Sequence, residues 1–408
     1  MHLIETSGNA IDTSLLRGRR GWDILLLAGI CLRVALSAIS LGSDDAVIWQ
    51  RFAEHISTHG LFDLYRTNQE FNHPPIPGYW AMLAYNFTRH HRAQFGFVFR
   101  VPGILADVLS CFLLLKIGNR RALRTNQQGL GPKMALVFAW SPCAILMSGF
   151  HGSTDSVYAA LCLLAAYCAT ELASPFAAGL ALGAAINVKL IPVMLIVPFL
   201  LLFRSPIAAG KFIAGLVLMV VPFIPVLIES GSAFHHNAME YNSAIDYWGV
   251  DQILLEAQTV DKYAGWGVVL LAEYHDVGRY LIFASILTFA LIARRKQLDF
   301  YTTGAGAAAL FLIFTPGFGV QYLVFVLPLL IAADLKRGLI YGLLAGAFMF
   351  IAYDLFWDGS IPIQTLGIAG RVRRGPGDLL ALLTWAQLIV FVFRAVSRPT
   401  PAPLPAAT

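Results

Sequence analysis

Charged side chains are scarce in this sequence: Asp, Glu, Lys and Arg make up only 13% of the 408 residues, whereas 57% of the residues are apolar. A single water-soluble core of this length cannot bury so much apolar surface and still present a wettable exterior. The composition therefore excludes an ordinary soluble globular protein. It indicates that lipid surrounds much of the molecule.

The sequence also lacks the marks of a cysteine-bound metal site, a disulfide framework or a nucleic-acid-binding protein. Its five cysteines all lie in apolar runs without a CxxC spacing, which is typical of small buried side chains. The net charge of +5 comes from short basic groups between apolar runs rather than from one basic stripe. This pattern indicates membrane topology and excludes a nucleic-acid partner. No clear internal repeat is present.

Apolar runs about as long as a bilayer span predict one all-α domain over residues 1–396, with about twelve transmembrane helices. The Pro-rich segment 397–408 cannot form a core, so we expect a disordered cytoplasmic tail there. We place the spans at 22–40, 99–117, 133–149, 156–172, 176–188, 190–203, 212–228, 277–293, 301–315, 319–333, 338–354 and 379–394.

Basic residues indicate which end of the predicted bundle faces the cytoplasm. With the N-terminus inside, nearly all the loop arginines and lysines between the spans fall on the inner side, as the positive-inside rule requires. The long loops 41–98 and 229–276 then face outward, with shorter outer loops near 150–155, 316–318 and 355–378. We therefore expect the functional groups on the outer face of a multi-pass membrane protein.

The first outer loop begins with an amphipathic segment and an acidic pair. From Asp44 to Thr58, the apolar residues Ile48, Phe52 and Ile56 recur at helical spacing, which predicts an interfacial helix. Asp44 and Asp45 stand at its start, where a carboxylate could remove a proton from a hydroxyl group as general base. An ordinary alternative is capping of the helix start by Ser43 and two acidic residues.

Two histidine-containing segments are further candidates for substrate binding. His73 precedes Pro74 and Pro75, which fix its direction, although a rigid turn at a helix start explains the same residues. His151 and Asp155 bracket a tight Gly-Ser-Thr turn between two apolar runs. They could bind a sugar hydroxyl or a divalent ion, whereas turn formation alone explains the glycine and one capping group.

Lys189 interrupts the apolar stretch from Ala177 to Phe203. An ammonium group in hydrocarbon costs on the order of 3 kcal/mol, so it normally faces a cavity or a partner such as phosphate. The alternative is a lysine that extends to the membrane interface from a short helix. Arg33 and Asp107 are also placed within spans, and we expect them to pair inside the bundle.

The last two outer loops supply the remaining candidates. Arg371, Arg373 and Arg374 are placed outside against the positive-inside pattern, which indicates a phosphate site or else a wrongly threaded last loop. Gln321 and Tyr322 follow the turn Pro316–Gly319 and could bind a sugar, although turn chemistry explains the glycines equally well.

Taken in order, these segments resemble the GT-C membrane glycosyltransferases. The resemblance rests on the acidic pair after the first span, His-Pro-Pro, His-Gly-Ser-Thr-Asp, Asn-Val-Lys-Leu-Ile-Pro and Pro-Gly-Phe-Gly-Val-Gln-Tyr, and it covers roughly residues 20 to 395. The sequence is most similar to bacterial members of the mannosyltransferase type, which use polyprenyl-phosphate sugars.

The resemblance implies an inverting transfer of a sugar from a polyprenyl-phosphate carrier to a hydroxyl of a glycan or lipid acceptor. Asp44 or Asp45 would be the general base, and Lys189 would lie near the donor phosphate. Some relatives use a divalent cation bound by acidic residues in Asp-x-Asp order, whereas the aspartates here are adjacent, so the metal stays open and no other cofactor is implied. The competing functions are a transporter or flippase for a lipid-linked or small polar substrate, and a non-catalytic assembly protein.

Overall fold

A computed structural model gives the structure of the chain and describes residues 13–241, 248–260, 264–353 and 375–397. The described residues are helical and contain no β-strand, which confirms the predicted all-α class. The predicted Pro-rich tail lies outside the described residues, except for Ser397, which is the last residue of α19. The elements are α1 (Thr13–Ile39), α2 (Asp44–His59), α3 (Leu61–Thr67), α4 (Pro75–His90), α5 (Phe95–Thr125), α6 (Leu130–Ala139), α7 (Pro142–Leu146), η1 (Met147–His151), α8 (Asp155–Thr170), α9 (Pro175–Val188), η2 (Ile191–Leu195), α10 (Ile196–Leu202), α11 (Pro206–Leu218), η3 (Val221–Phe223), α12 (Ile224–Phe234), η4 (His235–Met239), α13 (Gly249–Gln258), α14 (Ala264–Lys296), α15 (Phe300–Phe314), η5 (Val320–Tyr322), α16 (Leu323–Ala333), α17 (Leu335–Ala352) and α19 (Pro376–Ser397).

Six of the described helical stretches are long and apolar enough to cross a membrane, or up to seven if the bent pair formed by α6 and α7–η1 is one span. The two halves of that pair meet at an angle of 47°. Other apolar helices, such as α8, α9, α15 and α16, are shorter than the 18 residues of a straight crossing. The chain is thus a multi-pass membrane protein, but the predicted number of about twelve spans is not confirmed by these lengths.

Several helices begin at residues that local chemistry favours. The side chains of Ser174, Asp299 and Asp334 each accept a hydrogen bond from the backbone N–H three residues later, at the starts of α9, α15 and α17. Such capping satisfies one of the free N–H groups at a helix start. Proline is the first residue of α4, α9 and α11, where it has no N–H to leave unpaired.

Helices α15 and α16 form the centre of the bundle. Every residue of α15 from Tyr301 to Ile313 is buried, and so is every residue of α16 from Leu323 to Ala332. The glycines and alanines of α15 allow neighbouring helices to approach closely, because small side chains bring backbones together in a bundle. Helices α1, α11, α14 and α19 expose most of their side chains instead, as expected for a surface that faces lipid.

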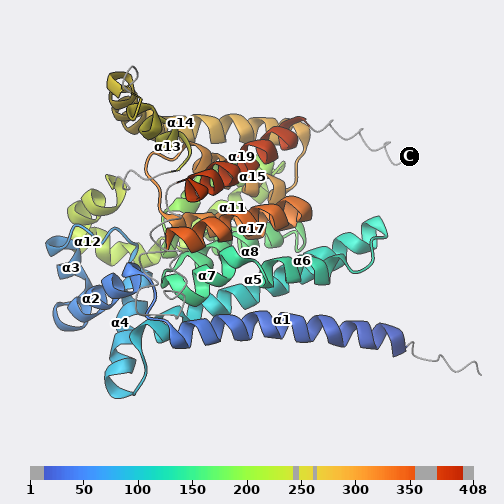
Figure 1. The fold of residues 1–408 in the computed structure, drawn as a ribbon, viewed down its shortest axis with the longest axis horizontal. Coiled ribbons are helices and arrows are strands. Elements are labelled where there is room, and N and C mark those ends of the chain that lie inside the picture. The colour runs from blue at the N-terminus through green and yellow to red at the C-terminus, as the bar shows by residue number, and fades with distance from the viewer. Residues whose placement is uncertain (1–12, 242–247, 261–263, 354–374, 398–408) are drawn as a thin grey trace, which may run out of the picture.

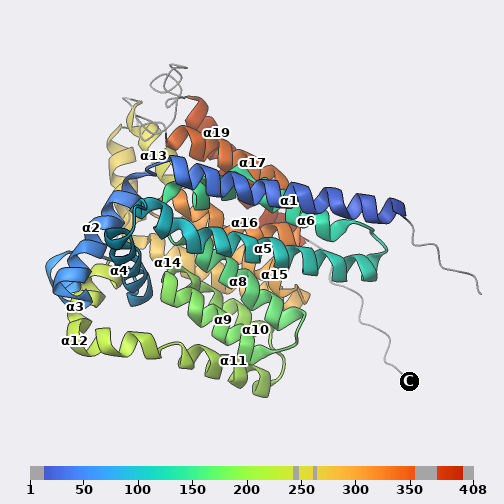
Figure 2. The same ribbon diagram turned by 90° about the horizontal axis from the view of Figure 1, so that it is seen from below.

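A second apolar cluster joins α2, α3 and α4 to the start of α5 and to α12 at one end of the molecule. Its centre is a group of aromatic rings, in which Trp49, Phe52, Phe71 and Phe99 contact one another. Both ribbon views place these helices together, opposite the end at which α1 begins and α19 ends (Figure 1, Figure 2). The predicted stripe of α2 therefore packs against protein through Phe52 and Ile56.

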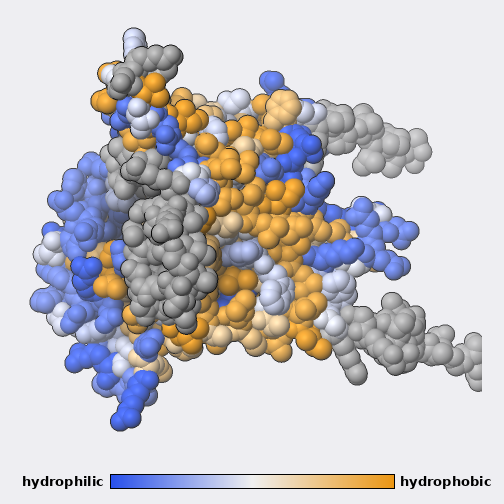
Figure 3. Space-filling view, viewed as in Figure 1, coloured by the Kyte–Doolittle hydropathy of each residue, from blue (hydrophilic) through white to orange (hydrophobic). Residues whose placement is uncertain are grey.

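The surface divides into zones that match a bilayer. Figure 3 shows a broad apolar band around the middle of the bundle, with hydrophilic side chains gathered at its two ends. Within the band, Arg33 and Asp107 are both buried and form an ion pair with 2.7 Å between Nε and Oδ2. Asp107 also accepts a hydrogen bond from Ser148 at 2.7 Å. The two charges within the spans are thus paired inside the bundle, as predicted.

Candidate functional site

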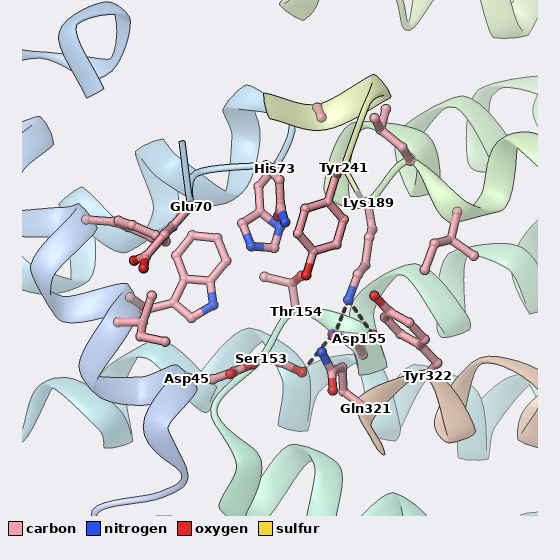
Figure 4. A pocket seen from close by; sticks show the side chains of 17 residues that line it. Asp45, Glu70, His73, Ser153, Thr154, Asp155, Lys189, Tyr241, Gln321 and Tyr322 are labelled. Atoms are coloured by element: carbon pink, nitrogen blue, oxygen red, sulfur yellow. Dashed lines mark hydrogen bonds and ion pairs between the residues drawn. The ribbon is translucent and has the colours of Figure 1, made fainter. Parts of the chain in front are cut away.

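A cavity of about 350 Å³ opens between the α2–α4 end of the molecule and the helical bundle. Its wall combines polar and aromatic side chains from segments far apart in the sequence, and Figure 4 shows them pointing toward a common space. The lining residues are Asp45, Ile48, Trp49, Phe52, Glu70, Asn72, His73, Ser153, Thr154, Asp155, Lys189, Leu190, Ile191, Ala238, Tyr241, Gln321 and Tyr322. Six of the residues predicted for the site therefore meet here: Asp45, His73, Asp155, Lys189, Gln321 and Tyr322.

The two aspartates of the acidic pair lie in different surroundings. Asp45 lines the cavity, whereas Asp44 is exposed and does not line it. Successive residues of a helix point about 100° apart, so only one of two neighbours can face a given cavity. Ser43 makes no capping bond, because its hydroxyl donates to the backbone carbonyl of His151 at 2.6 Å. The capping alternative thus explains only the acidic charges in the first turn of α2.

The charges around Asp45 favour its ionised form. Burial opposes ionisation, but the adjacent ring of His151 and the charge of Lys189 outweigh it, so the pKa of Asp45 lies below its ordinary value of 3.8. The carboxylate is one-third exposed and faces the cavity. It is therefore available as an acceptor of a proton at neutral pH.

Lys189 lies on the opposite side of the cavity and forms an ion pair with Asp155. Its Nζ atom is 2.8 Å from Oδ1 and 3.1 Å from Oδ2 of Asp155, a carboxylate that is almost fully buried. The chain is extended at Lys189, between the end of α9 and η2, and this break turns the ammonium group toward the cavity. The ring of Tyr322 lies 4.8 Å from Nζ, a distance typical of a cation–π contact.

His73 closes the cavity beside Trp49, with 4.5 Å between the two ring centroids. Tyr65 donates a hydrogen bond from its hydroxyl to the His73 carbonyl at 2.6 Å and so fixes the backbone before Pro74. Burial, together with the charge of Lys189, lowers the pKa of His73 to about 3, although Asp45 acts in the opposite direction. The ring is therefore neutral at physiological pH and can take part in the site only through hydrogen bonds and stacking.

His151 does not line the cavity, although the sequence predicts it as a binding residue. It is buried at the end of η1, and its Nε2 atom lies 3.0 Å from Oδ2 of Asp45, out of line for a hydrogen bond. On its other side, Nδ1 lies 2.9 Å from the hydroxyl of Tyr353. Sequence reasoning missed Tyr353, because nothing in the pattern of the apolar run 338–354 distinguishes it from an interfacial tyrosine.

Gln321 and Tyr322 belong to η5, at the end of the Pro316–Gly319 turn. Gly317 has a positive φ of 80°, which favours glycine, and its N–H donates a hydrogen bond to the buried carboxylate of Asp251 at 2.9 Å. His275 also contacts that carboxylate, with 3.0 Å between Nε2 and Oδ2. Asp251 thus fastens the turn that brings η5 to the cavity.

Other predicted and unpredicted residues complete the account of the site. Arg371, Arg373 and Arg374 lie outside the described residues. Glu70 and Tyr241 line the cavity, but they stand in irregular segments where no periodic pattern indicates a direction. Within the part of the chain that the structure describes, no three His, Cys, Asp or Glu side chains are grouped to hold a metal ion.

The geometry of the cavity can bind a ligand and accept a proton from it. Asp45 and Glu70 lie on the α2 side, and the Lys189–Asp155 pair lies on the side formed by η5 (Figure 4). A ligand between them would meet a proton acceptor at one end and a cation at the other. Aromatic rings, among them Trp49 and Tyr322, provide apolar surface between these groups.

Comparison with known proteins is consistent with a membrane protein of this type. Two solved structures resemble the chain: ArnT from Cupriavidus metallidurans in the apo state (17% identity, 93% of this chain and 77% of that one, TM-score 0.48) and the same protein bound to undecaprenyl phosphate (15% identity, 92% and 77%, TM-score 0.46). No curated protein matches the sequence. A family model for the GPI transamidase subunit PIG-U matches residues 43–250, the region that contains Asp45, His73, Asp155 and Lys189. Because this match takes in just over half of the residues, the chain belongs to the PIG-U family, within the GT-C superfamily of membrane proteins that its sequence resembles.

Proposed function

We propose that the cavity is the active site of a membrane glycosyltransferase, which moves a sugar from a polyprenyl-phosphate carrier to a hydroxyl of a glycan or lipid acceptor. The observation that supports this most is the position of Asp45 across one cavity from Lys189, with aromatic side chains between them. A transferase of this kind needs one base for the acceptor and one cation for the leaving phosphate. We assign the first role to Asp45 and the second to Lys189.

In the proposed step, the acceptor oxygen attacks the anomeric carbon while its proton passes to Asp45. The bond from the anomeric carbon to the phosphate oxygen breaks with inversion, and polyprenyl phosphate leaves with the electron pair. Lys189 stabilises the charge that develops on the phosphate. Its ammonium group has three N–H donors, and its two contacts with Asp155 leave one donor for the phosphate. Arg371, Arg373 and Arg374 stay a prediction as further phosphate ligands.

The site lies at the end of the bundle opposite to the start of α1. With a cytoplasmic N-terminus, the cavity would face the outer side of a bacterial plasma membrane, where lipid-linked sugars and envelope glycans would meet. Mannose and related hexoses are the first sugars to test, because the sequence resembles mannosyltransferase-type members of the superfamily.

The test uses the purified full-length chain in lipid nanodiscs with a panel of polyprenyl-phosphate hexoses and a glycan or lipid acceptor. Release of polyprenyl phosphate is measured for the wild type, for Asp45→Asn and for the matched control Asp44→Asn. We expect Asp45→Asn to lower the rate by about 10²-fold or more, as is typical for loss of a general base, and Asp44→Asn to leave it nearly unchanged. Equal effects of the two substitutions would remove Asp45 from the mechanism, and vectorial movement of the lipid without cleavage would indicate a flippase.

A second candidate function follows from the family match. PIG-U is described as a subunit of GPI transamidase, so members of this family also act within an assembly. For this chain, that alternative is a non-catalytic assembly protein that uses the cavity to hold a lipid-linked glycan. In that case, cells with Asp45→Asn would keep normal envelope glycans, and the chain would co-purify with an enzyme that acts on its ligand.

A further inference from the structure

The surroundings of His151 indicate a role different from substrate binding. The side chain is 4% exposed, does not line the cavity and lies behind Asp45, with 3.0 Å between Nε2 and Oδ2. A group in the cavity would therefore contact Asp45 rather than the ring. Whatever His151 does for a ligand, it must do through that carboxylate.

The opposite nitrogen of the ring is held by two hydroxyl groups. Nδ1 lies 3.1 Å from Oγ of Ser43 and 2.9 Å from the hydroxyl of Tyr353. Tyr353 also stacks on the ring, with 5.4 Å between centroids and 29° between planes. Ser43 stands directly before α2, and Tyr353 ends α17, so the ring is fixed between two elements far apart in the sequence.

The hydrogen bonds around the ring indicate which nitrogens of His151 carry a proton. The single proton of Ser43 is committed to the His151 carbonyl, 2.6 Å away, because a carbonyl oxygen can only accept. The Ser43 oxygen can therefore only accept from Nδ1. A bare Nδ1 could accept from the Tyr353 hydroxyl, but its lone pair would then face the lone pairs of Ser43 at 3.1 Å, so a proton on Nδ1 is the arrangement that suits both hydroxyl groups. A neutral ring would then turn the lone pair of Nε2 toward the carboxylate of Asp45 at 3.0 Å. A ring protonated on both nitrogens avoids this repulsion and pairs with the ionised carboxylate.

We propose that His151 is a positioning residue, a charged ring oriented by Ser43 and Tyr353 that keeps the Asp45 carboxylate ionised and turned into the cavity. This inference rests on the proposed function in one respect only, namely that Asp45 is the base whose position matters for transfer. The arrangement itself, a buried cation behind a carboxylate at a cavity wall, is independent of the substrate.

Other charged groups around the pair define the background against which His151 acts. Lys189 and His73 face Asp45 across the cavity; the charge of Lys189 acts in the same direction as that of His151, whereas the His73 ring is neutral at physiological pH. The remaining groups on the packed elements are Asp44 on α2, Asp155 at the start of α8, Arg100 of α5 beside Gly42, and Tyr353. Lys189 is already paired with Asp155. Loss of His151 would therefore remove the positive charge that lies closest to Asp45 and is not paired with another carboxylate.

The first test measures the ionisation of Asp45 without any substrate. Infrared difference spectra of the full-length protein are recorded over a pH series, and subtraction of Asp45→Asn identifies the carboxyl band of Asp45. In His151→Gln, we expect its titration to move upward by about one pH unit or more, because an opposite charge within a few ångströms favours the ionised form. Tyr353→Phe removes only a hydroxyl group and should move the titration in the same direction by less. An unchanged titration in both variants would overturn the proposal.

The second test separates positioning from binding by kinetics. If His151 positions Asp45, then His151→Gln lowers kcat by about 100-fold, as expected for a misplaced catalytic group, and leaves KM for the lipid donor nearly unchanged. A large rise in KM with kcat preserved would mean that the ring binds substrate and would refute the proposal. Should the wild type transfer no sugar at all, the proposed function fails, but the infrared titration still decides the role of His151.

Discussion

The Lys189–Asp155 ion pair gives the sharpest prediction about stability, because its two partners are separated by 2.8 Å and shielded from water. The Asp155 side chain is 1% exposed and that of Lys189 is 12% exposed. At an effective dielectric constant of about 20, the attraction between the charges is about 6 kcal/mol, much of which offsets the cost of removing both from water. The net value of the pair is therefore modest, although each partner depends strongly on the other.

Lys189→Met leaves the Asp155 carboxylate buried without its cation, and Asp155→Asn leaves the ammonium group without its anion. We expect each single substitution to lower the free energy of unfolding by about 3–5 kcal/mol, the usual cost of an uncompensated buried charge. The double variant contains neither charge, so it should lose less than the sum of the two. The expected coupling in the double-mutant cycle is about 2–3 kcal/mol.

The assay is thermal unfolding of the four proteins in one detergent, supported by inactivation half-lives where unfolding is irreversible. Arg204→Met is the matched control, since Arg204 is exposed and its loss should change stability by no more than about 0.5 kcal/mol. Strict additivity of the two single effects would refute the reasoning. It would show that the two charges are hydrated in the membrane rather than dependent on each other.

Two further predictions concern pH and helix packing. The pKa of Asp45 in the folded protein lies below 3.8, so its carboxylate is ionised at and above that pH and loses its charge only at lower pH. We therefore expect kcat/KM to show no acidic limb above about pH 4. An acidic limb near pH 6 in the wild type would contradict this assignment. A Cβ atom on Gly179 of α9 would overlap the backbone carbonyl of Phe212 in α11, so Gly179→Ala should lower stability by about 1–3 kcal/mol. The control is Gly210→Ala on α11, where a Cβ meets open space, and this substitution should not lower stability. Equal melting temperatures for the two variants would contradict the packing argument.

The sequence was sufficient for the fold class because apolar runs of bilayer length have few alternatives to a helical bundle. It was less informative about where helices break. The predicted span 133–149 is the bent pair α6 and α7–η1, and the predicted outer loop 229–276 includes the first turns of α14. Such breaks depend on packing against neighbours, which hydropathy does not measure. These breaks matter most for the predicted number of spans, because a short apolar helix has the same composition as a whole span.

The choice between Asp44 and Asp45 could have been made from the sequence. Asp45, Trp49, Phe52 and Ile56 recur at helical spacing, so Asp45 lies on the same face as the apolar residues that α2 buries. Asp44 lies about 100° away from it and points outward. The pairing of Lys189 with Asp155 could not have been found this way, because the two residues come from different helices and no local periodicity relates them.

The polar contacts that hold helix α1 against its neighbours have a consequence for the cavity. Lipid and protein are equally good apolar neighbours for the side chains of this helix. Apolar contact alone therefore does not stop α1 from turning about its axis. Arg33 prevents this rotation: besides its ion pair with Asp107 of α5, it donates hydrogen bonds to the carbonyls of Phe138 and Ala139 in α6. Only a short connection separates the end of α1 from Asp45. The alignment of the Asp45 carboxylate is therefore set partly by the buried Arg33–Asp107 pair within the bundle, which does not line the cavity.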